Sequence, residues 1–309
     1  MKQKHFLISL TVLAIGISVD AQTKDNVKTT FQTSREWKPS IDNRADAVMV
    51  YGVGGNPSDK SRKLSFEERV KSWKERGYII HFMTGIAWGE YQDYFTGQWD
   101  GKWHLDEGQV TQTGDTIWHG HMVPYIVPSE NFLSYLKERH VKRVIDAGVD
   151  AIWVGDDFGS QTSTLFAPEM FRKLLLPYYK KMIDTLKAKK PDLVMILHSD
   201  GAVGTLMPMI KECGFDVFNP VQPGVPLHSP QEVKDKYGDM FAFWGAIDQQ
   251  YLMPNGTDEE LEADIKERIE ILGKGGGYMV APAHIIQADV KPERVEKFIE
   301  LCKKYGQIY

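Results

Sequence analysis

Short apolar runs alternate with longer amphipathic segments along this chain, and the alternation becomes regular after residue 129. The apolar runs are nearly continuous, which is typical of strands that are buried on both faces of a parallel sheet. The predicted strands are 45–55, 78–85, 149–159, 192–201, 215–224, 240–248 and 278–287.

The amphipathic segments carry apolar residues at helical spacing, and several begin at Ser or Thr and end at Gly. They predict helices at 65–77, 128–148, 167–191, 205–214, 229–238, 257–277 and 291–306. Pro177 should bend or interrupt the helix predicted at 167–191. Strands and helices that alternate over about 250 residues favour a (β/α)8 TIM-type barrel. An open, doubly wound sheet is the alternative, but no G-x-G-x-x-G turn opens a helix as a dinucleotide-binding sheet requires.

The N-terminal residues have the pattern of an export signal. Lys2 and Lys4 precede an apolar stretch from Phe6 to Val19, and small residues precede Gln22. This pattern predicts a signal peptide at 1–21, with an uncleaved anchor as the less favoured alternative. The mature protein is then exported, to the periplasm or the medium. After the signal peptide, the sequence predicts a loose leader at 22–44 and a single barrel domain at 45–309. This domain contains an aromatic-rich insertion at 86–128.

The overall composition indicates which classes of partner the protein binds. The chain has 309 residues, of which 42% are hydrophobic and 26% charged, with a net charge of −5. This ordinary globular composition favours neither nucleic acid nor an anionic membrane surface, so the expected partner of the mature form is a small-molecule substrate. Cys213 and Cys302 fall in separate predicted helices, and we expect two buried free thiols. Nothing in the sequence predicts the oligomeric state.

Polar residues follow the apolar runs at one end only. Because the carboxyl ends of parallel strands meet at one mouth of a barrel, these side chains should converge there. The residues are Asp156, Asp157, His198, Asp200, Asn219, Gln222, Asp248, His284 and Gln287.

His198, Asp200 and His284 form a candidate metal site within this set. Residues i and i+2 of a strand point to the same face, and a later strand adds the second imidazole. Two nitrogens and one oxygen with an open position suit a divalent metal, zinc above all, with manganese or iron as options. In the alternative interpretation Asp200 caps a loop and His198 is a hydrogen-bonded core histidine.

The remaining candidates would handle the substrate. Asp156 and Asp157 are adjacent and point to opposite faces, so one should face the mouth as a general acid or base and the other should cap. His284 is a further catalytic candidate, and Gln222, Asp248 and Gln287 are candidate substrate-binding groups. In the insertion, Trp88, Glu90 and Trp99 belong to a mixture of aromatic rings and acids that resembles a sugar-binding platform. Alternatively, the insertion packs on its own aromatic residues.

Five segments carry a family resemblance: "AGVDAIWVGDDFGSQTS", "FAPEMFRKLLLPYYKKM", "ILHSDGAVGTLMPMIKECGFDVFNPVQP", "KYGDMFAFWGAIDQQYLMPNGT" and "GGGYMVAPAHIIQADVKPERV". From about Val141 to Tyr305 the chain resembles the uroporphyrinogen decarboxylase superfamily, which includes cobalamin-linked methyltransferases. The resemblance implies a (β/α)8 barrel with its site at the carboxyl-terminal mouth. His284 matches the histidine of the decarboxylases.

Two departures from the superfamily patterns shape the expected function. The methyltransferases have His-x-Cys where this chain has "HSDG", so Asp200 replaces a thiolate, and His284 replaces a second one. The arginine loop of the decarboxylases has no counterpart near Arg44, Arg62 or Arg69. We therefore expect an exported metal-dependent enzyme with lyase-type or hydrolytic chemistry on a small oxygen-rich substrate, with a carbohydrate derivative as one option. The alternatives are a tetrapyrrole decarboxylase or corrinoid-type methyltransferase proper, and a periplasmic ligand-binding protein.

Overall fold

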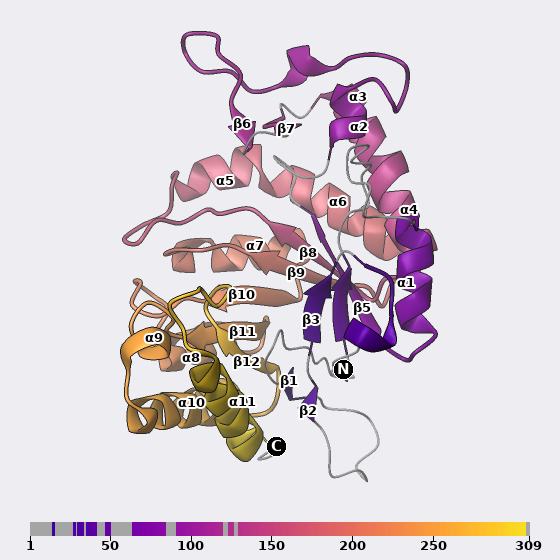
Figure 1. The fold of residues 1–309 in the computed structure, drawn as a ribbon. Coiled ribbons are helices and arrows are strands. Elements are labelled where there is room, and N and C mark those ends of the chain that lie inside the picture. The colour runs from indigo at the N-terminus through magenta and orange to yellow at the C-terminus, as the bar shows by residue number, and fades with distance from the viewer. Residues whose placement is uncertain are drawn as a thin grey trace.

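A curled parallel sheet surrounded by helices makes up most of the molecule (Figure 1). This computed structural model describes residues 14–15, 27–28, 30–33, 35–41, 47–50, 64–84, 91–119, 123–126 and 129–306.

The main sheet is one ladder in which each neighbouring pair from β3 to β12 is parallel, in the order β3-β4-β5-β8-β9-β10-β11-β12. Beyond β12 the short strands β1 (Ala14–Ile15) and β2 (Val27–Lys28) add an antiparallel edge. The parallel strands are β3 (Thr30–Thr33), β4 (Ala47–Val50), β5 (Ile79–Thr84), β8 (Ala151–Gly155), β9 (Val194–His198), β10 (Val217–Val221), β11 (Ala242–Ile247) and β12 (Tyr278–Pro282).

Ring contacts across the sheet show how far it curls. Trp153 of β8 and Trp244 of β11 meet edge to face with 4.5 Å between ring centroids, although two strands separate them in the ladder. His81 of β5 lies 6.3 Å from the same Trp244 ring. Side chains from opposite sides of the curl therefore fill a common interior, as in a TIM-type barrel, and the predicted fold class is confirmed.

Helices connect and cover the strands, and most begin where the sequence predicts. Ser65 and Thr257 each form a capping box, with Glu68 and Glu260 respectively, and Ser129 caps α3. The helices are α1 (Phe66–Lys74), α3 (Glu130–Tyr135), the π-helical η3 (Leu136–Lys142), α4 (Arg143–Asp146), α5 (Pro168–Leu174), α6 (Leu176–Lys189), α7 (Met207–Cys213), α8 (Pro230–Tyr237), α9 (Leu252–Asn255), α10 (Asp258–Leu272) and α11 (Pro292–Tyr305), with 3-10 turns η1 (Pro39–Ile41) and η4 (Gly204–Leu206).

Several local predictions can be checked directly. The long helix breaks at Leu175, two residues before Pro177, which confirms the expected interruption. Cys213 and Cys302 are both buried and free, also as expected, and burial raises the pKa of Cys213 to about 12. Within the stretch predicted as a leader, Thr30–Thr33 forms β3 and pairs with β4.

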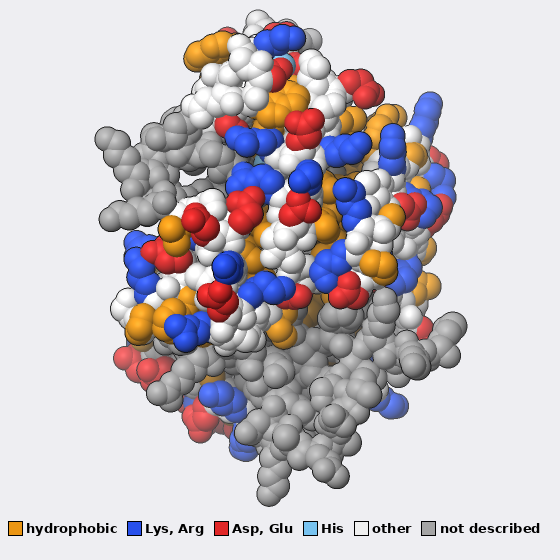
Figure 2. Space-filling view, turned by 90° about the vertical axis from the view of Figure 1, so that its right-hand side faces the viewer, with side chains coloured by type: hydrophobic (Ala, Val, Ile, Leu, Met, Phe, Trp, Pro, Cys, Tyr) orange, Lys and Arg blue, Asp and Glu red, His pale blue; other side chains and the backbone are white. Residues whose placement is uncertain are grey.

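The surface and the N-terminus add two observations. On the face shown in Figure 2, Lys and Arg side chains are interspersed with Asp and Glu. Within the described part of the chain, no helix has the length and apolar character needed to span a membrane. The predicted signal peptide at 1–21 lies outside the described residues, apart from the two residues of β1.

The aromatic insertion forms a small second core beside the barrel. It contains α2 (Gln92–Phe95), η2 (Leu105–Glu107), β6 (Trp118–His119) and β7 (Val123–Pro124), and it packs on α3. Buried Asp93 accepts hydrogen bonds from the guanidinium of Arg139 and the phenol of Tyr135, which ties α2 to α3 and η3. The buried cluster comprises Tyr91, Tyr94, Phe95, Ile126, Phe132 and Tyr135.

His81 is an unusual member of the barrel interior. Its side chain is fully buried, and neither ring nitrogen has a hydrogen-bond partner among the described residues. Burial lowers the pKa of His81 to about 3, because a charged imidazolium would lose its solvation there.

This burial predicts a pH-dependent loss of stability that His81→Leu should reduce. As the pH falls below about 6.5, the unfolded imidazole takes up a proton that the folded one refuses. Between pH 7 and pH 5 the wild-type protein should lose about 2 kcal/mol more unfolding free energy than the variant. Urea denaturation of both proteins at the two pH values measures the difference. Equal losses would show that folded His81 binds the proton.

Candidate active site

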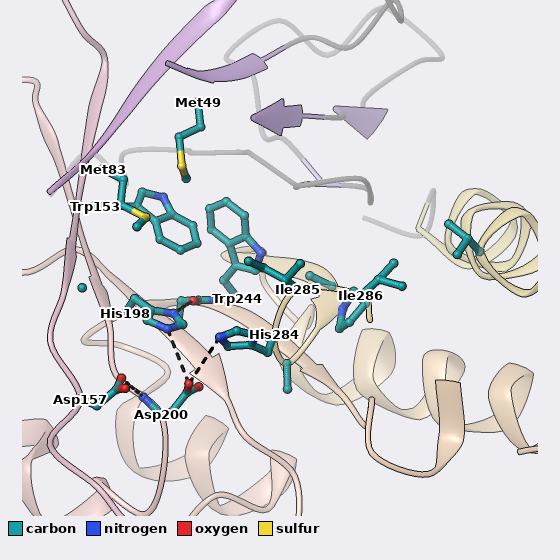
Figure 3. Close-up of a pocket in the computed structure, with 16 residues that line it drawn as sticks. Met49, Met83, Trp153, Asp157, His198, Asp200, Trp244, His284, Ile285 and Ile286 are labelled. Carbon is teal, nitrogen blue, oxygen red and sulfur yellow. Dashed lines mark hydrogen bonds and ion pairs between the residues drawn. The ribbon is translucent and has the colours of Figure 1, made fainter. Parts of the chain in front are cut away.

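A cavity of about 720 Å³ opens where several parallel strands end (Figure 3). Among the described residues that line it, the polar groups lie together at one end, and the others are mostly apolar. The described residues that line it are Met49, Met83, Trp153, Gly155, Asp157, His198, Asp200, Asn219, Trp244, Ala281, Pro282, Ala283, His284, Ile285, Ile286 and Val295.

His198, Asp200 and His284 converge within this cavity, and we call them the triad. The Nε2 atoms of both histidines lie 3.7 Å from Oδ2 of Asp200, and one ligand atom from each residue lies within 4.8 Å of the other two. Figure 3 shows both imidazoles directed at the carboxylate. The structure therefore brings together the three residues that the sequence nominates as metal ligands.

The backbone after β9 explains how Asp200 reaches this position. The strand ends at His198, so Asp200 lies in the following turn rather than on the strand itself. Gly201 adopts a φ of +86°, and a Cβ there would lie 2.4 Å from the carbonyl carbon of Gly159. Only glycine allows this close approach of two loops. The sequence "HSDG" thus encodes a strand end followed by a tight turn.

Side chains from neighbouring loops hold this turn. The backbone N–H of Asp200 donates to Asp157 Oδ1 at 2.9 Å, and that of Gly201 donates to Gln222 Oε1 at 2.7 Å. Gln222 also donates to Gln161. Gln222 therefore supports the turn that carries Asp200, and it is not among the residues lining the cavity.

Two amide side chains position the histidines. Asn219 Oδ1 lies 2.6 Å from His198 Nδ1, and since a carbonyl oxygen only accepts, Nδ1 is the donor of this hydrogen bond and Nε2 is left to face Asp200. Gln249 accepts from the N–H of His284 and donates to the carbonyl of Ile285, so it holds the backbone of the loop that follows β12. Neither amide was predicted to position a histidine, although Asn219 is one of the polar residues predicted at the ends of the strands.

The surroundings of the Asp200 carboxyl disfavour its ionised form. Burial raises the pKa of the Asp200 carboxyl above its usual value. The two imidazoles oppose this rise, and the neighbouring Asp157 carboxylate adds to it. A divalent cation between the three groups would offset both burial and like-charge repulsion.

The donor atoms also fit a metal in geometry. Tetrahedral zinc with ligands at about 2.0–2.1 Å places neighbouring donor atoms about 3.4 Å apart. The two nitrogen–carboxylate separations of 3.7 Å require only a small contraction, and the three ligand atoms all lie within 4.8 Å of one another, so the two imidazoles have to approach each other as the metal binds. With three protein donors, one tetrahedral position stays open for water or substrate, as in catalytic zinc sites.

The two adjacent aspartates divide as their geometry predicts. Asp157 is exposed and lines the cavity beside Asp200. Asp156 turns the other way and accepts a hydrogen bond of 2.7 Å from the phenol of Tyr179 on α6. Burial and the Asp156 carboxylate raise the pKa of Tyr179 well above its usual value. Asp156 therefore fastens α6 to the end of β8, outside the cavity.

Three other predicted substrate-binding residues lie elsewhere. Asp248 accepts hydrogen bonds from the backbone of its own loop, and Gln287 donates to the carbonyl of Ile285. Trp99 packs on the insertion's aromatic cluster and donates to Glu138. None of these three residues lines the cavity. Trp88 and Glu90 lie outside the described residues.

The apolar part of the cavity was not predicted from the sequence. Met49, Met83, Trp153 and Trp244 belong to strands that read simply as buried apolar runs. An apolar run does not reveal which of its side chains stop below a cavity and which fill solid core. Their shared placement on the interior face becomes visible only once the sheet is curled.

These features define the class of the protein: a parallel α/β barrel with a polar cluster at the carboxyl ends of its strands. The family model for uroporphyrinogen decarboxylase (URO-D) matches residues 131–305, which is more than half of the chain. The chain belongs to this family.

Curated relatives are distant and match in part. The chain is 26% identical over 173 residues to uroporphyrinogen decarboxylase of Pelodictyon phaeoclathratiforme, which covers 55% of this chain and 46% of that protein. It is 27% identical over 164 residues to the enzyme of Hordeum vulgare, covering 53% and 46%. The chain thus spans about half the length of the curated relatives it matches.

Solved structures support the fold. A methyltransferase from Methanosarcina mazei superposes with a TM-score of 0.51 at 18% identity, covering 77% of this chain and 63% of that one. Amy13B of Eubacterium rectale gives 0.53 at 11% identity, covering 85% and 71%. At such identities these likenesses show the barrel fold alone.

The contact between Asp156 and Tyr179 makes a stability prediction. Asp156→Ala leaves the buried Tyr179 phenol without this acceptor and should cost roughly 1–3 kcal/mol of unfolding free energy. Adding Tyr179→Phe removes the stranded hydroxyl and should recover part of that loss. Urea denaturation of the two single variants and the double variant measures the coupling. Strictly additive effects would contradict the structural role given to Asp156.

Proposed function

We propose that this protein is a divalent-metal-dependent enzyme whose metal is held by His198, Asp200 and His284. The convergence of their three ligand atoms within 4.8 Å is the observation that carries the proposal. The hydrogen bond from His198 Nδ1 to Asn219 adds to it, since histidines that bind metals usually donate their other ring N–H to a neighbouring acceptor.

The proposed chemistry is lyase-type or hydrolytic, on a small substrate that presents oxygen atoms to the metal. Imidazole and carboxylate donors make a harder site than thiolates do, and a harder site suits oxygen. Bound zinc would supply Lewis acidity to a substrate oxygen. Asp157 lies next to the triad and is the proposed proton carrier, because its carboxylate lines the same cavity.

Decarboxylation of a tetrapyrrole is the second candidate, and the names of the curated relatives favour it. It predicts activity without a resident metal at the triad. Export, with the protein working in the periplasm or the medium, remains part of the proposal on the strength of the N-terminal pattern.

Elemental analysis of the purified protein tests the metal site. Wild-type protein should carry about one equivalent of zinc, manganese or iron, because three donors hold a catalytic metal firmly. His198→Ala should lose it. His104→Ala is the matched control, since His104 also lies beside two carboxylates, Asp100 and Glu107, but belongs to the insertion. Protein that still binds no metal after incubation with zinc would refute the proposal and favour the metal-free decarboxylase.

Asn219→Ala tests the support of the metal ligand. Losing the acceptor frees the His198 ring to rotate and to change tautomer, so the affinity for zinc should fall roughly 10–100-fold. Competition with a chromophoric chelator measures this affinity. Asn219→Asp keeps an oxygen acceptor and should remain closer to wild type. Unchanged affinity in folded Asn219→Ala would show that the hydrogen bond does not position His198 for a metal.

A further inference from the structure

The cavity has two chemically distinct parts. At one end lie the triad and Asp157, with nitrogen and oxygen donors. The remainder includes a surface that we call the apolar wall, formed by Met49, Met83, Trp153, Trp244, Ile285 and Ile286. A binding site of this composition is complementary to a molecule with one polar end and an apolar body.

Trp153 joins the two parts without a gap. Its ring stacks beside His198, with 5.9 Å between centroids and an interplanar angle of 21°, and its edge-to-face contact with Trp244 is closer still at 4.5 Å. The rings of His198 and His284 are 5.8 Å apart. The apolar wall therefore begins one ring away from the triad, and one small molecule can touch both.

The loop after β12 makes the same connection on the other side. Ile285 and Ile286 follow His284 directly, and both line the cavity together with Trp244 (Figure 3). Ile285 is 57% exposed, so more than half of its side chain is available to contact a ligand in the cavity. Covering such surface with an apolar group is favourable by about 25 cal/mol per Å².

The size and the flexibility of the cavity set limits on the body. A volume of about 720 Å³ falls in the range of pockets that hold drug-sized molecules. Met49 and Met83 offer unbranched side chains that adapt to different shapes. Trp153 and Trp244 are 8% and 1% exposed, so their rings line the cavity with little free surface, and the exposed side chain of Ile285 offers the body a larger apolar contact.

We propose that the substrate is an amphipathic small molecule: a single head with oxygen donors binds at the triad, and an apolar carbon body, aromatic or aliphatic, lies against the apolar wall. This inference rests on the proposed function, because the metal at the triad would take the head. The sequence predicts an oxygen-rich substrate, and in this inference only the head of the substrate is rich in oxygen. The described aromatic residues of the insertion line none of this cavity, so they lend no support to a sugar-binding platform.

Hydroxamates with different bodies test the inference, because the hydroxamate head chelates divalent metals. Calorimetry on zinc-loaded protein should show 2-naphthohydroxamate binding on the order of 30-fold or more tightly than acetohydroxamate. The larger ligand should also give a more negative heat-capacity change, the mark of apolar burial. Hexanohydroxamate should bind more tightly than gluconohydroxamate, which has the same number of carbons but carries hydroxyls. The reverse order would overturn the inference in favour of a polyhydroxylated substrate.

Repeating the titrations on metal-free protein separates the two proposals. If the naphthyl preference survives but zinc changes neither affinity, the apolar wall is supported and the metal proposal fails. If zinc strengthens both ligands but the body makes no difference, the metal proposal stands and the inference is overturned. Failure of both ligands to bind either form would overturn both.

A variant at the edge of the cavity tests where the apolar body of the ligand binds. Ile285→Ser should weaken 2-naphthohydroxamate several-fold and leave acetohydroxamate unchanged, since only the body reaches Ile285. Leu174→Ser is the matched control, because Leu174 is an exposed aliphatic residue on α5 and does not line the cavity. An equal effect of the two variants on 2-naphthohydroxamate would contradict the placement of the body.

Discussion

The contact between Trp153 and Trp244 is the constraint on which the candidate site depends. These rings come from strands that are not neighbours, and they meet only because the parallel sheet curls around its interior. Together they fill the barrel beneath the mouth and leave a cavity above, where the strand ends carry polar groups. Trp153 also stacks beside His198. The packing that fills the barrel interior therefore also supports the ring of His198, a candidate metal ligand, where it faces the cavity.

Much of the fold was predictable from local pattern. Continuous apolar runs marked the parallel strands, and Ser65, Ser129 and Thr257 marked helix starts through their capping hydrogen bonds. The convergence of His198, Asp200 and His284 also followed from one topological rule, that parallel strands end at a common mouth. That rule needs no knowledge of individual side-chain contacts.

What could not be predicted depends on partners distant in sequence. Asp156 and Asp157 look alike in the chain, and only the phenol of Tyr179, supplied by α6, shows which one turns outward. Gln222 was predicted to bind a substrate, but its Oε1 accepts a hydrogen bond from the backbone N–H of Gly201. Polar residues at a mouth can either face a ligand or support the loops that do, and the spacing of residues does not distinguish these roles.

The insertion buries its aromatic residues in a core of its own, separate from the main apolar core of the barrel. Asp93, Arg139 and Tyr135 fasten it to η3 and α3, while the strands that shape the cavity contribute nothing to its buried cluster. The insertion is therefore a separate packing unit. A substitution inside its aromatic cluster leaves the side chains of the barrel core in place, because the two buried clusters have no residue in common.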